Sequence, residues 1–364
     1  MKIGICVNHF HPSVGGAELV AKTIADYLSS EHKVFVFTRK LKEKRNPTNY
    51  PYPIYEHIPG DESGFDKRIK SLQLDLVLIY SDVFDFFRPL INQKNKFKLI
   101  VALCGANWTY QHRGFLTVFR HAKNVDKFIC HSKFERDYKL CQSENLIQKT
   151  VIIPNGVWTS EFDNNTLKRK DILPDLVNKK WILNVSNFFP GKGQEHLIDI
   201  LSELSNPEQL VYIQVCNDIE FPIGHQLEQK WTLLSKHLKQ KGMIVKLLKN
   251  QPRDKVIGLF KQSNAFAFTS EKEVAPIVLL ESMAASLPWI SANIGNAEEL
   301  AGGKCVSTVK NSQFHVIFGN RTKSIFAQEL QSVMNSPSLG EEGRKLIDKQ
   351  LTWDKILPMY QMII

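Results

Sequence analysis

Two glutamates bracket an uncharged, mostly apolar run in the segment EVAPIVLLES, residues 273–282. An apolar, strand-like run ends just before it, and Pro276 suits the first turn of a helix. We therefore expect Glu273 in a loop at the carboxyl end of a strand, and Glu281 about one turn into the helix. The free N–H groups of the helix N-terminus between these carboxylates would seat an anion. A ligand that joins a sugar, a diphosphate and a ribose presents its groups in that order.

Other residues offer complementary chemistry for a phosphate. Lys192 stands between two glycines in PGKG, where a flexible ammonium can neutralise diphosphate charge. Gly15 and Gly16 precede a run with helical spacing, so their backbone can approach a phosphate at a helix N-terminus. An ordinary turn, a surface lysine, a solvated loop acid and a first-turn helix acid are the alternative interpretations of these residues, and they stay open.

The apolar runs that must position these residues alternate with helical stretches. Strand-like runs are nearly continuous rather than alternating, which indicates parallel sheets covered on both faces. In the first part they cover residues 2–7, 32–38, 74–80, 97–104, 126–132 and 150–156. A second series begins at residue 181 and includes the runs WILNVS, LVYIQV, MIVKLL, NAFAFTS and LPWISA. The pattern predicts an α/β protein with two Rossmann-like, doubly wound parallel-sheet domains.

The expected domain boundaries follow changes in composition. Residues 1–158 form the first domain, the polar stretch 159–180 is a linker, and residues 181–350 form the second domain. Residues 351–364 form an amphipathic helix that we expect to pack onto the second domain. Two such domains would face each other across a cleft at the carboxyl ends of their strands, which is where sheets of this kind bind ligands.

Charge is distributed unevenly over the 364 residues. Residues 1–158 contain 23 Lys and Arg against 15 Asp and Glu, whereas the remainder contains 24 against 22. A basic first domain favours an anionic partner surface, such as acidic lipid headgroups. No run is long and apolar enough to span a bilayer, and the six scattered cysteines are typical of free thiols in a reducing compartment. We expect a cytoplasmic protein, or one peripheral on the inner face of a membrane.

Four motifs in this order resemble one known family. HPSVGGAE (residues 11–18), VIIPNGV (151–157), ILNVSNFFPGKG (182–193) and the Glu273–Glu281 pair followed by MAASLP are similar to motifs of the retaining, nucleotide-sugar-dependent glycosyltransferases of the GT-B fold, specifically glycosyltransferase family 4. The resemblance covers nearly the whole chain. It implies two Rossmann-like domains, the second of which binds the nucleotide sugar.

The resemblance also implies roles for individual residues. Glu281 would bind the ribose hydroxyls and Glu273 the transferred sugar, while Lys192 would stabilise the departing diphosphate. The backbone of Val274, Ala275, Pro276 and Ile277 would meet the sugar and the diphosphate, together with Gly15 and Gly16. No metal ion and no further cofactor is then expected, because the lysine and the helix termini supply the positive charge.

The chain departs from the family pattern at three places. Asn187 stands where the family usually has an arginine, so it is a candidate catalytic residue without a charge. In ALCGANW (residues 102–108), Asn107 lies near the position of a usual histidine. The family's Gly-x-x-Glu region appears here as IGNAEEL (residues 294–300), and Gly295 and Asn296 are expected to close over the donor.

The candidates for binding an acceptor lie in the first domain. His9 and His11 follow the first strand, and one of them would orient an acceptor hydroxyl. An aromatic and basic cluster, whose aromatic faces suit sugar rings, contains Trp108, Tyr110, His112 and Arg113. Core packing explains Trp108 equally well, and a capping or surface position explains the histidines.

Together these observations predict a hexosyltransferase. It would move a sugar, with retention, from a nucleotide diphosphate sugar to a lipid-linked, polysaccharide or other glycan acceptor, with an anionic membrane surface as a further partner. Two alternatives are a non-catalytic nucleotide- or glycan-binding relative and a nucleotide-sugar epimerase of the same fold. A nucleic-acid partner is disfavoured, because the sequence contains no dedicated recognition motif.

Overall fold

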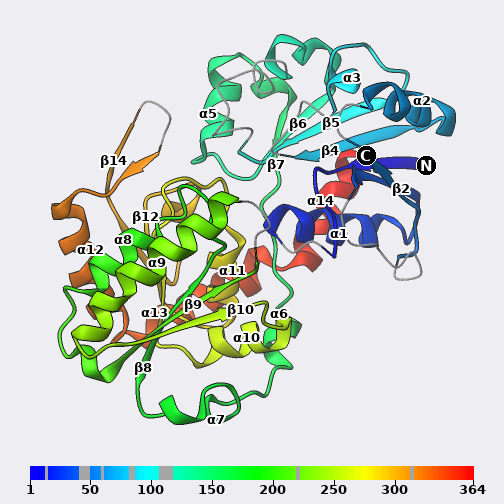
Figure 1. The fold of residues 1–364 in the computed structure, drawn as a ribbon. Helices are drawn as coiled ribbons and strands as arrows, with labels where there is room; N and C mark the ends of the chain where they lie inside the picture. The colour runs from blue at the N-terminus through cyan, green and yellow to red at the C-terminus, as the bar shows by residue number, and fades with distance from the viewer. Residues whose placement is uncertain are drawn as a thin grey trace. The chain divides into compact units, whose positions relative to one another are not determined.

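The computed structural model describes residues 1–12, 15–40, 50–58, 61–81, 87–105, 118–218, 222–311 and 315–364. The chain divides into two compact units (Figure 1). The first unit comprises Met1–Asn155 together with Asp354–Ile364, and the second comprises Gly156–Trp353.

The first unit is built on a seven-stranded parallel sheet with the order β3-β2-β1-β4-β5-β6-β7. The strands are β1 (Lys2–Cys6), β2 (Lys33–Arg39), β3 (Ile54–His57), β4 (Leu76–Ser81), β5 (Lys98–Leu103), β6 (Lys127–Cys130) and β7 (Thr150–Ile152). Every residue of the central strand β4 is buried, as continuous apolar strands of a two-sided parallel sheet require. The helices include α1 (Gly16–Leu28), α2 (Glu62–Leu72), α3 (Arg88–Ile91) and α5 (Arg136–Ser143).

The second unit repeats this plan with a six-stranded parallel sheet of order β10-β9-β8-β11-β12-β13. Its strands are β8 (Lys180–Val185), β9 (Leu210–Cys216), β10 (Ile244–Lys249), β11 (Ala265–Phe268), β12 (Trp289–Ala292) and β13 (Gly303–Val306). The helices are α6 (Thr159–Asp163), α7 (Arg169–Ile172), α8 (Gln194–Leu201), α9 (Pro222–Gln240), α10 (Arg253–Gln262), α11 (Ile277–Ala284), α12 (Asn320–Val333) and α13 (Pro337–Leu346). A separate antiparallel ribbon pairs β14 (Val309–Lys310) with β15 (Val316–Ile317).

Both sheets reverse direction beside their first strand. In each, the chain builds outward from that strand to one edge and then returns to its other side, which is the doubly wound order. The prediction of two Rossmann-like parallel-sheet domains is therefore confirmed. In such sheets, the loops at the carboxyl ends of the strands beside the reversal are the expected ligand site.

The observed division differs from the expected boundaries at two places. Residues 159–180, expected to be a linker, form α6 and α7 and bury Phe162, Ile172 and Leu176 in the core of the second unit. The C-terminal helix α14 (Trp353–Ile363) belongs from Asp354 onward to the first unit, not to the second. There the Lys98 ammonium donates to the carbonyl of Ile363 at 2.8 Å, a pairing between residues far apart in sequence that local patterns do not reveal.

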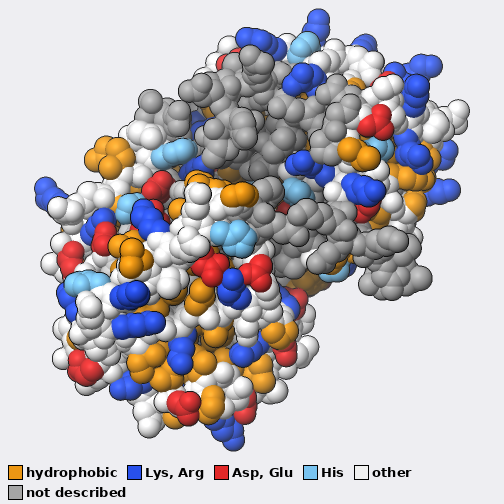
Figure 2. Space-filling view, in the orientation of Figure 1, with side chains coloured by type: hydrophobic (Ala, Val, Ile, Leu, Met, Phe, Trp, Pro, Cys, Tyr) orange, Lys and Arg blue, Asp and Glu red, His pale blue; other side chains and the backbone are white. Residues whose placement is uncertain are grey.

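The charge asymmetry of the sequence is visible on the surface. On the face drawn in Figure 2, acidic side chains are sparse on the first unit and interspersed with basic ones on the second. In the described part of the chain, no helix has both the length and the apolar character needed to cross a bilayer.

Candidate nucleotide-sugar site

Two loops at one edge of the second sheet carry the predicted lysine and the first predicted acid. Strands β8 and β11 are parallel neighbours, with Ile182 opposite Ala265. Residues 186–193 follow β8, and residues 269–276 follow β11. Because parallel neighbours end at the same edge, these loops leave the sheet together at the point where the strand order reverses.

Glycines allow the two loops to touch. Gly193 has φ +67°, and a Cβ at this position would lie 1.9 Å from the carbonyl oxygen of Thr269. The Thr269 hydroxyl donates to the carbonyl of Gly193 at 2.7 Å. The carbonyl of Gly191 accepts from the N–H of Glu271 at 2.8 Å and from the Ser270 hydroxyl at 3.0 Å. The loops therefore form one hydrogen-bonded unit, which a side chain at residue 193 would separate.

The hydrogen bonds between the two loops bring Lys192 and Glu273 into contact. The Lys192 ammonium donates to Glu273 Oε1 at 2.6 Å. The lysine side chain is 30% exposed and the glutamate side chain 14%. The ion pair is thus partly open to solvent, and neither group is locked into the core. Both side chains retain some solvent-accessible surface.

Glu281 lies on the helix that follows. Helix α11 begins at Ile277 after Pro276, which is the N-cap rather than a first-turn residue, and no side chain caps this end. The first N–H groups of an α-helix lack i−4 partners, although here the N–H of Leu279 donates to the carbonyl of Pro276 at 3.1 Å. The Glu281 side chain is 7% exposed, and its Oε1 accepts from the Arg253 guanidinium. Sequence reasoning did not identify Arg253, because no local pattern links it to an acid 28 positions away.

The backbone between Glu273 and α11 is supported by the segment expected to close over the donor. Gly295 has φ +49°, and a Cβ there would lie 2.3 Å from the carbonyl oxygen of Val274. The next residue, Asn296, is nearly buried, and its side-chain Oδ1 has no hydrogen-bond partner in the described part of the chain. An unpaired buried acceptor of this kind is uncommon, and it suits a hydrogen-bond donor on an incoming ligand.

Asn187 is committed to the loop that carries it. Its Oδ1 accepts from the N–H of Asn217, just after β9, at 2.7 Å. Its carbonyl accepts from the side-chain amide of Gln194 at 2.9 Å. Both contacts hold the backbone of the β8 loop, so the residue has a structural task besides the predicted contact with a leaving group.

A histidine–glutamate pair that the sequence analysis missed links helix α8 to the loop after β11. The Nε2 atom of His196 lies 2.9 Å from Oε1 of Glu271, and its ring stacks on Phe318 with centroids 4.8 Å apart. The hydrogen bond from His196 lowers the pKa of Glu271, although burial acts the other way. The spacing of these residues alone gave no signal, because they follow different strands.

The predicted phosphate contact in the first unit meets an acid. Helix α1 begins at Gly16 with Gly15 as its N-cap. A Cβ on Gly15 would lie 2.3 Å from Oε2 of Glu18, so that carboxylate lies against the N-terminus of the helix. A phosphate at Gly15 and Gly16 would have to share this position with Glu18.

The predicted acceptor residues fall into two groups. In the first unit, Nδ1 of His11 lies 2.7 Å from the hydroxyl of Tyr50, and that hydroxyl also lies 3.0 Å from the carbonyl of His11. His9 is partly buried two residues before it. Asn107, Trp108, His112 and Arg113 lie outside the described residues, as does Tyr110.

A buried histidine occupies the carboxyl end of the first sheet, although not at the position where the family has one. His131 follows β6, and its Nδ1 lies 2.9 Å from the carbonyl of Ile153. Its Nε2 lies 3.3 Å from the hydroxyl of Tyr80, which donates to Oδ1 of Asn155 at 3.2 Å. Burial lowers the pKa of His131 to about 4, although the bond to Ile153 acts the other way. His131 thus contacts the PNG segment directly at Ile153, whereas Asn155 is held by Tyr80.

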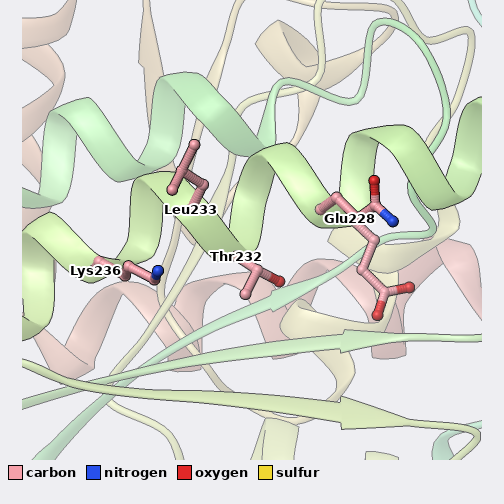
Figure 3. Close-up of a pocket in the computed structure, with 5 residues that line it drawn as sticks. Glu228, Thr232, Leu233 and Lys236 are labelled. Carbon is pink, nitrogen blue, oxygen red and sulfur yellow. The ribbon is translucent and has the colours of Figure 1, made fainter.

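A surface depression on the second unit is separate from these residues. It lies along the exposed side of α9 and is lined by Glu228, Gln229, Thr232, Leu233 and Lys236 (Figure 3). None of the predicted site residues lines it. No group of three or more His, Cys, Asp or Glu side chains in the described ranges is arranged to hold a metal ion, so the expectation about metals stays untested.

The fold and the loops define a class: a protein with two doubly wound α/β units whose second unit carries a lysine–glutamate pair at the carboxyl edge of its sheet. Models of two sequence families match this chain. Residues 14–161 match Glycosyltransferase Family 4, and residues 166–343 match Glycosyl transferases group 1. The chain belongs to the group 1, family 4 glycosyltransferases and has their GT-B fold.

Individual relatives are distant. An uncharacterized glycosyltransferase of Methanocaldococcus jannaschii is 24% identical over 65% of this chain, and the match spans 59% of that relative's length. N-acetyl-alpha-D-glucosaminyl L-malate synthase of Bacillus anthracis is 22% identical, with coverage of 100% of this chain and 96% of the relative. The structure of Anabaena HepE in complex with UDP has a TM-score of 0.75 at 17% identity, with 100% of this chain and 99% of that chain covered. The same Anabaena protein has also been solved with UDP-glucose.

Proposed function

We propose that this protein is a retaining hexosyltransferase that uses a nucleotide diphosphate sugar. The observation that carries the proposal is the contact between Lys192 and Glu273 at the carboxyl edge of the second sheet, with Glu281 on the next helix. A partly exposed cation lies beside a carboxylate, and a second carboxylate follows an uncapped helix N-terminus. This order of groups complements a diphosphate flanked by a sugar and a ribose.

Donor binding would exchange partners at the ion pair. In the unliganded protein, Glu273 neutralises Lys192. The diphosphate would take over the ammonium, and Glu273 would then accept hydrogen bonds from hydroxyls of the transferred sugar. Because the side chains are 30% and 14% exposed, this exchange requires little desolvation of either group.

Transfer would then depend on stabilising the leaving group. The bond between the anomeric carbon and the diphosphate oxygen breaks while the acceptor oxygen bonds to that carbon on the same face. The acceptor proton passes to the departing diphosphate. Lys192 and the free N–H groups of α11 would stabilise the negative charge that develops there. We propose that these groups act without a divalent metal ion.

The donor class is supported by a structural relative. Anabaena HepE, which shares the fold, has been solved with UDP and with UDP-glucose. We propose a nucleotide diphosphate hexose as donor for this chain as well, held by Glu281 at the ribose and by the backbone of Val274, Ala275, Pro276 and Ile277 at the sugar and diphosphate.

The acceptor would be held by the first unit. Its excess of basic residues supports a lipid-linked or polysaccharide acceptor and an anionic membrane surface. The protein would then work in the cytoplasm or on the inner face of a membrane. Flotation with vesicles of anionic lipid tests the membrane part, and a protein that stays unbound at low salt would contradict it.

Asn187 favours a second candidate, a non-catalytic relative that binds a nucleotide sugar without turnover. Its side chain accepts from the backbone of Asn217 and adds no positive charge beside the leaving group. Lys192 would then act in binding alone.

One set of experiments tests the proposal and separates these functions. Thermal unfolding is measured with UDP-, GDP-, ADP- and dTDP-linked hexoses, because binding to the native state raises the unfolding temperature. The donor with the largest shift is then incubated alone and with glycan acceptors, and the products are identified by NMR. Retained α- or β-configuration in a transfer product supports the proposal. Binding without turnover favours the second candidate, and conversion of the donor alone would indicate an epimerase. A protein that binds none of the donors contradicts the proposal.

A further inference from the structure

Glu281 is a nearly buried carboxylate with one neutralising partner. Its Oε1 accepts from the guanidinium of Arg253, and no residue in the described ranges donates to its Oε2. A buried carboxylate requires a cation or hydrogen-bond donors to remain charged. Arg253 therefore fixes one oxygen and leaves the other for a ligand.

Arg253 is itself held on a second side. Its other terminal nitrogen donates to Oε2 of Glu161 at 2.7 Å, and the guanidinium carbon lies 5.9 Å from the ring centroid of Phe162. Both contacts come from α6, which lies beside α10 (Figure 1). A planar guanidinium shared between two carboxylates is restricted in both position and orientation.

Further bonds fix α6 against α10. The Lys261 ammonium donates to the carbonyls of Phe162 and Asn165, each at 2.6 Å. The side-chain amide of Asn165 donates to the carbonyl of Asp254 at 2.7 Å. These bonds restrict the movement of α6 relative to α10, and Arg253 connects both helices to Glu281.

The position of Arg253 on its helix makes this arrangement informative. Arg253 is the first residue of α10, where the helix dipole disfavours a cation. Burial also acts to lower the pKa of its guanidinium, but Glu281 and Glu161 raise it above its usual value. Arg253 therefore stays charged over any practical pH range, and the two carboxylates offset the cost of its location.

We propose that Arg253 is a positioning residue that orients Glu281 for the two ribose hydroxyls of a nucleoside diphosphate. The inference rests on the proposed function and names the part of the site that would distinguish ribose from deoxyribose. With Oε1 fixed by Arg253, Oε2 is held where a sugar hydroxyl can donate to it. Without Arg253 the carboxylate would lose its orientation, and affinity would fall most for ligands that carry both hydroxyls.

The test uses the full-length protein and titration calorimetry. UDP, GDP and ADP and their 2′-deoxy counterparts are titrated into the wild type, Arg253→Gln, Arg253→Lys, Glu281→Gln and the double variant of Arg253→Gln with Glu281→Gln. For the nucleotide that binds, we expect Arg253→Gln to weaken the ribonucleotide about tenfold or more and to remove most of the preference over the deoxynucleotide. Arg253→Lys should restore part of that preference, because an ammonium restores the positive charge but not the planar geometry with which the guanidinium donates to two carboxylates.

Lys304→Gln is the matched control. Lys304 forms an ion pair with Glu329 and, like Arg253, has a 39% exposed side chain. This variant should bind like the wild type. In the Glu281→Gln background, the Arg253→Gln change should have little further effect, because Arg253 acts through Glu281.

The possible failures are distinct. If the wild type binds a ribonucleotide and Arg253→Gln keeps both the affinity and the ribose preference, the inference is overturned and the proposed function stands. The same holds if Arg253→Gln weakens ribonucleotide and deoxynucleotide equally, which would indicate general loosening of the fold. If the wild type binds no nucleoside diphosphate, the proposed function fails and takes the inference with it.

Discussion

The two sheets share the doubly wound strand order, but the side chains at their carboxyl edges differ in charge and in burial. In the second unit, the edge beside β8 carries Lys192 and Glu273 in a partly exposed ion pair. In the first unit, the corresponding edge carries His131 and Tyr80, both buried and bonded to the PNG segment. In the second unit, a ligand can replace one partner of the ion pair. In the first unit, the groups are neutral and their hydrogen bonds are all made within the protein.

This difference teaches that a common topology fixes where polar groups gather but not what they do. Burial decides whether a polar group serves the fold or a ligand, because a buried polar group forms its hydrogen bonds within the protein. Partly exposed groups retain capacity for a ligand. On this basis, substitutions at Lys192 or Glu273 should change transfer more than stability, and substitutions at His131 or Tyr80 should change stability more than transfer.

Lys192→Ala should give the largest effect. Removing the ammonium removes charge stabilisation of the departing diphosphate, and we expect the transfer rate to fall about 100-fold or more with little change in the unfolding temperature. Initial rates and thermal unfolding of the same preparation measure this. Lys230→Ala is the control, because Lys230 pairs with Glu195 on an exposed surface of the same unit. Equal transfer rates in wild type and Lys192→Ala would remove the lysine from the mechanism.

His131→Gln should change stability in a pH-dependent way. Burial lowers the pKa of His131 to about 4, whereas an unfolded histidine titrates near 6.5. The neutral form is favoured in the folded state, so its contribution is complete above about pH 6.5 and is lost as the pH falls toward 4. The wild type should lose about 3 kcal/mol of unfolding free energy over this interval that His131→Gln does not lose.

Urea unfolding at several pH values measures that difference. Burial raises the pKa values of the neighbouring acids Glu135 and Asp137, but both proteins contain them, so their contributions cancel in the comparison. Donor affinity should stay unchanged, because His131 belongs to the first unit. Parallel curves for the two proteins would mean that His131 is not held neutral.

Gly193→Ala tests whether the two loops must touch. The new Cβ would lie 1.9 Å from the Thr269 carbonyl oxygen, at a positive φ. We expect a loss of about 1–3 kcal/mol in unfolding free energy together with a fall in donor affinity, because Lys192 and Glu273 would separate. Gly319→Ala is the matched control, since its Cβ would have no neighbour within 4 Å. Normal donor affinity in Gly193→Ala would show that donor binding does not require the hydrogen bonds between the two loops.

Much of the fold was predictable because the buried strands are short, continuous apolar runs. The central strands β1, β4, β8 and β11 have this pattern. The edge strands β3 and β13 were not predicted, because each is four residues long and its apolar run is interrupted by a charged residue, Glu56 or Lys304. The ribbon strands β14 and β15 are two residues each, too short for any periodic signal.

The candidate site was predictable only where motifs are local. Lys192, Glu273 and Glu281 stand in compact segments whose turn and helix signals are visible in sequence. Arg253 and His196 reach the site through pairing of distant elements, which no local pattern encodes. The burial of His131 likewise depends on strand order rather than on its neighbours in sequence.

Asn187→Ala should give the smallest effect and refines the comparison within the second edge. Its Oδ1 is bonded to the N–H of Asn217, so the side chain holds a loop while Lys192 supplies the charge. Losing one such bond should lower the transfer rate less than tenfold and the unfolding free energy by about 1 kcal/mol. Rates and urea unfolding, compared with Asn187→Asp, measure both quantities. The aspartate retains an acceptor for Asn217 and should recover the stability, but its charge should repel the diphosphate and slow transfer. A 100-fold loss of the transfer rate in Asn187→Ala without loss of stability would instead mean that the asparagine contacts the leaving group directly. It would then act together with Lys192 on the diphosphate.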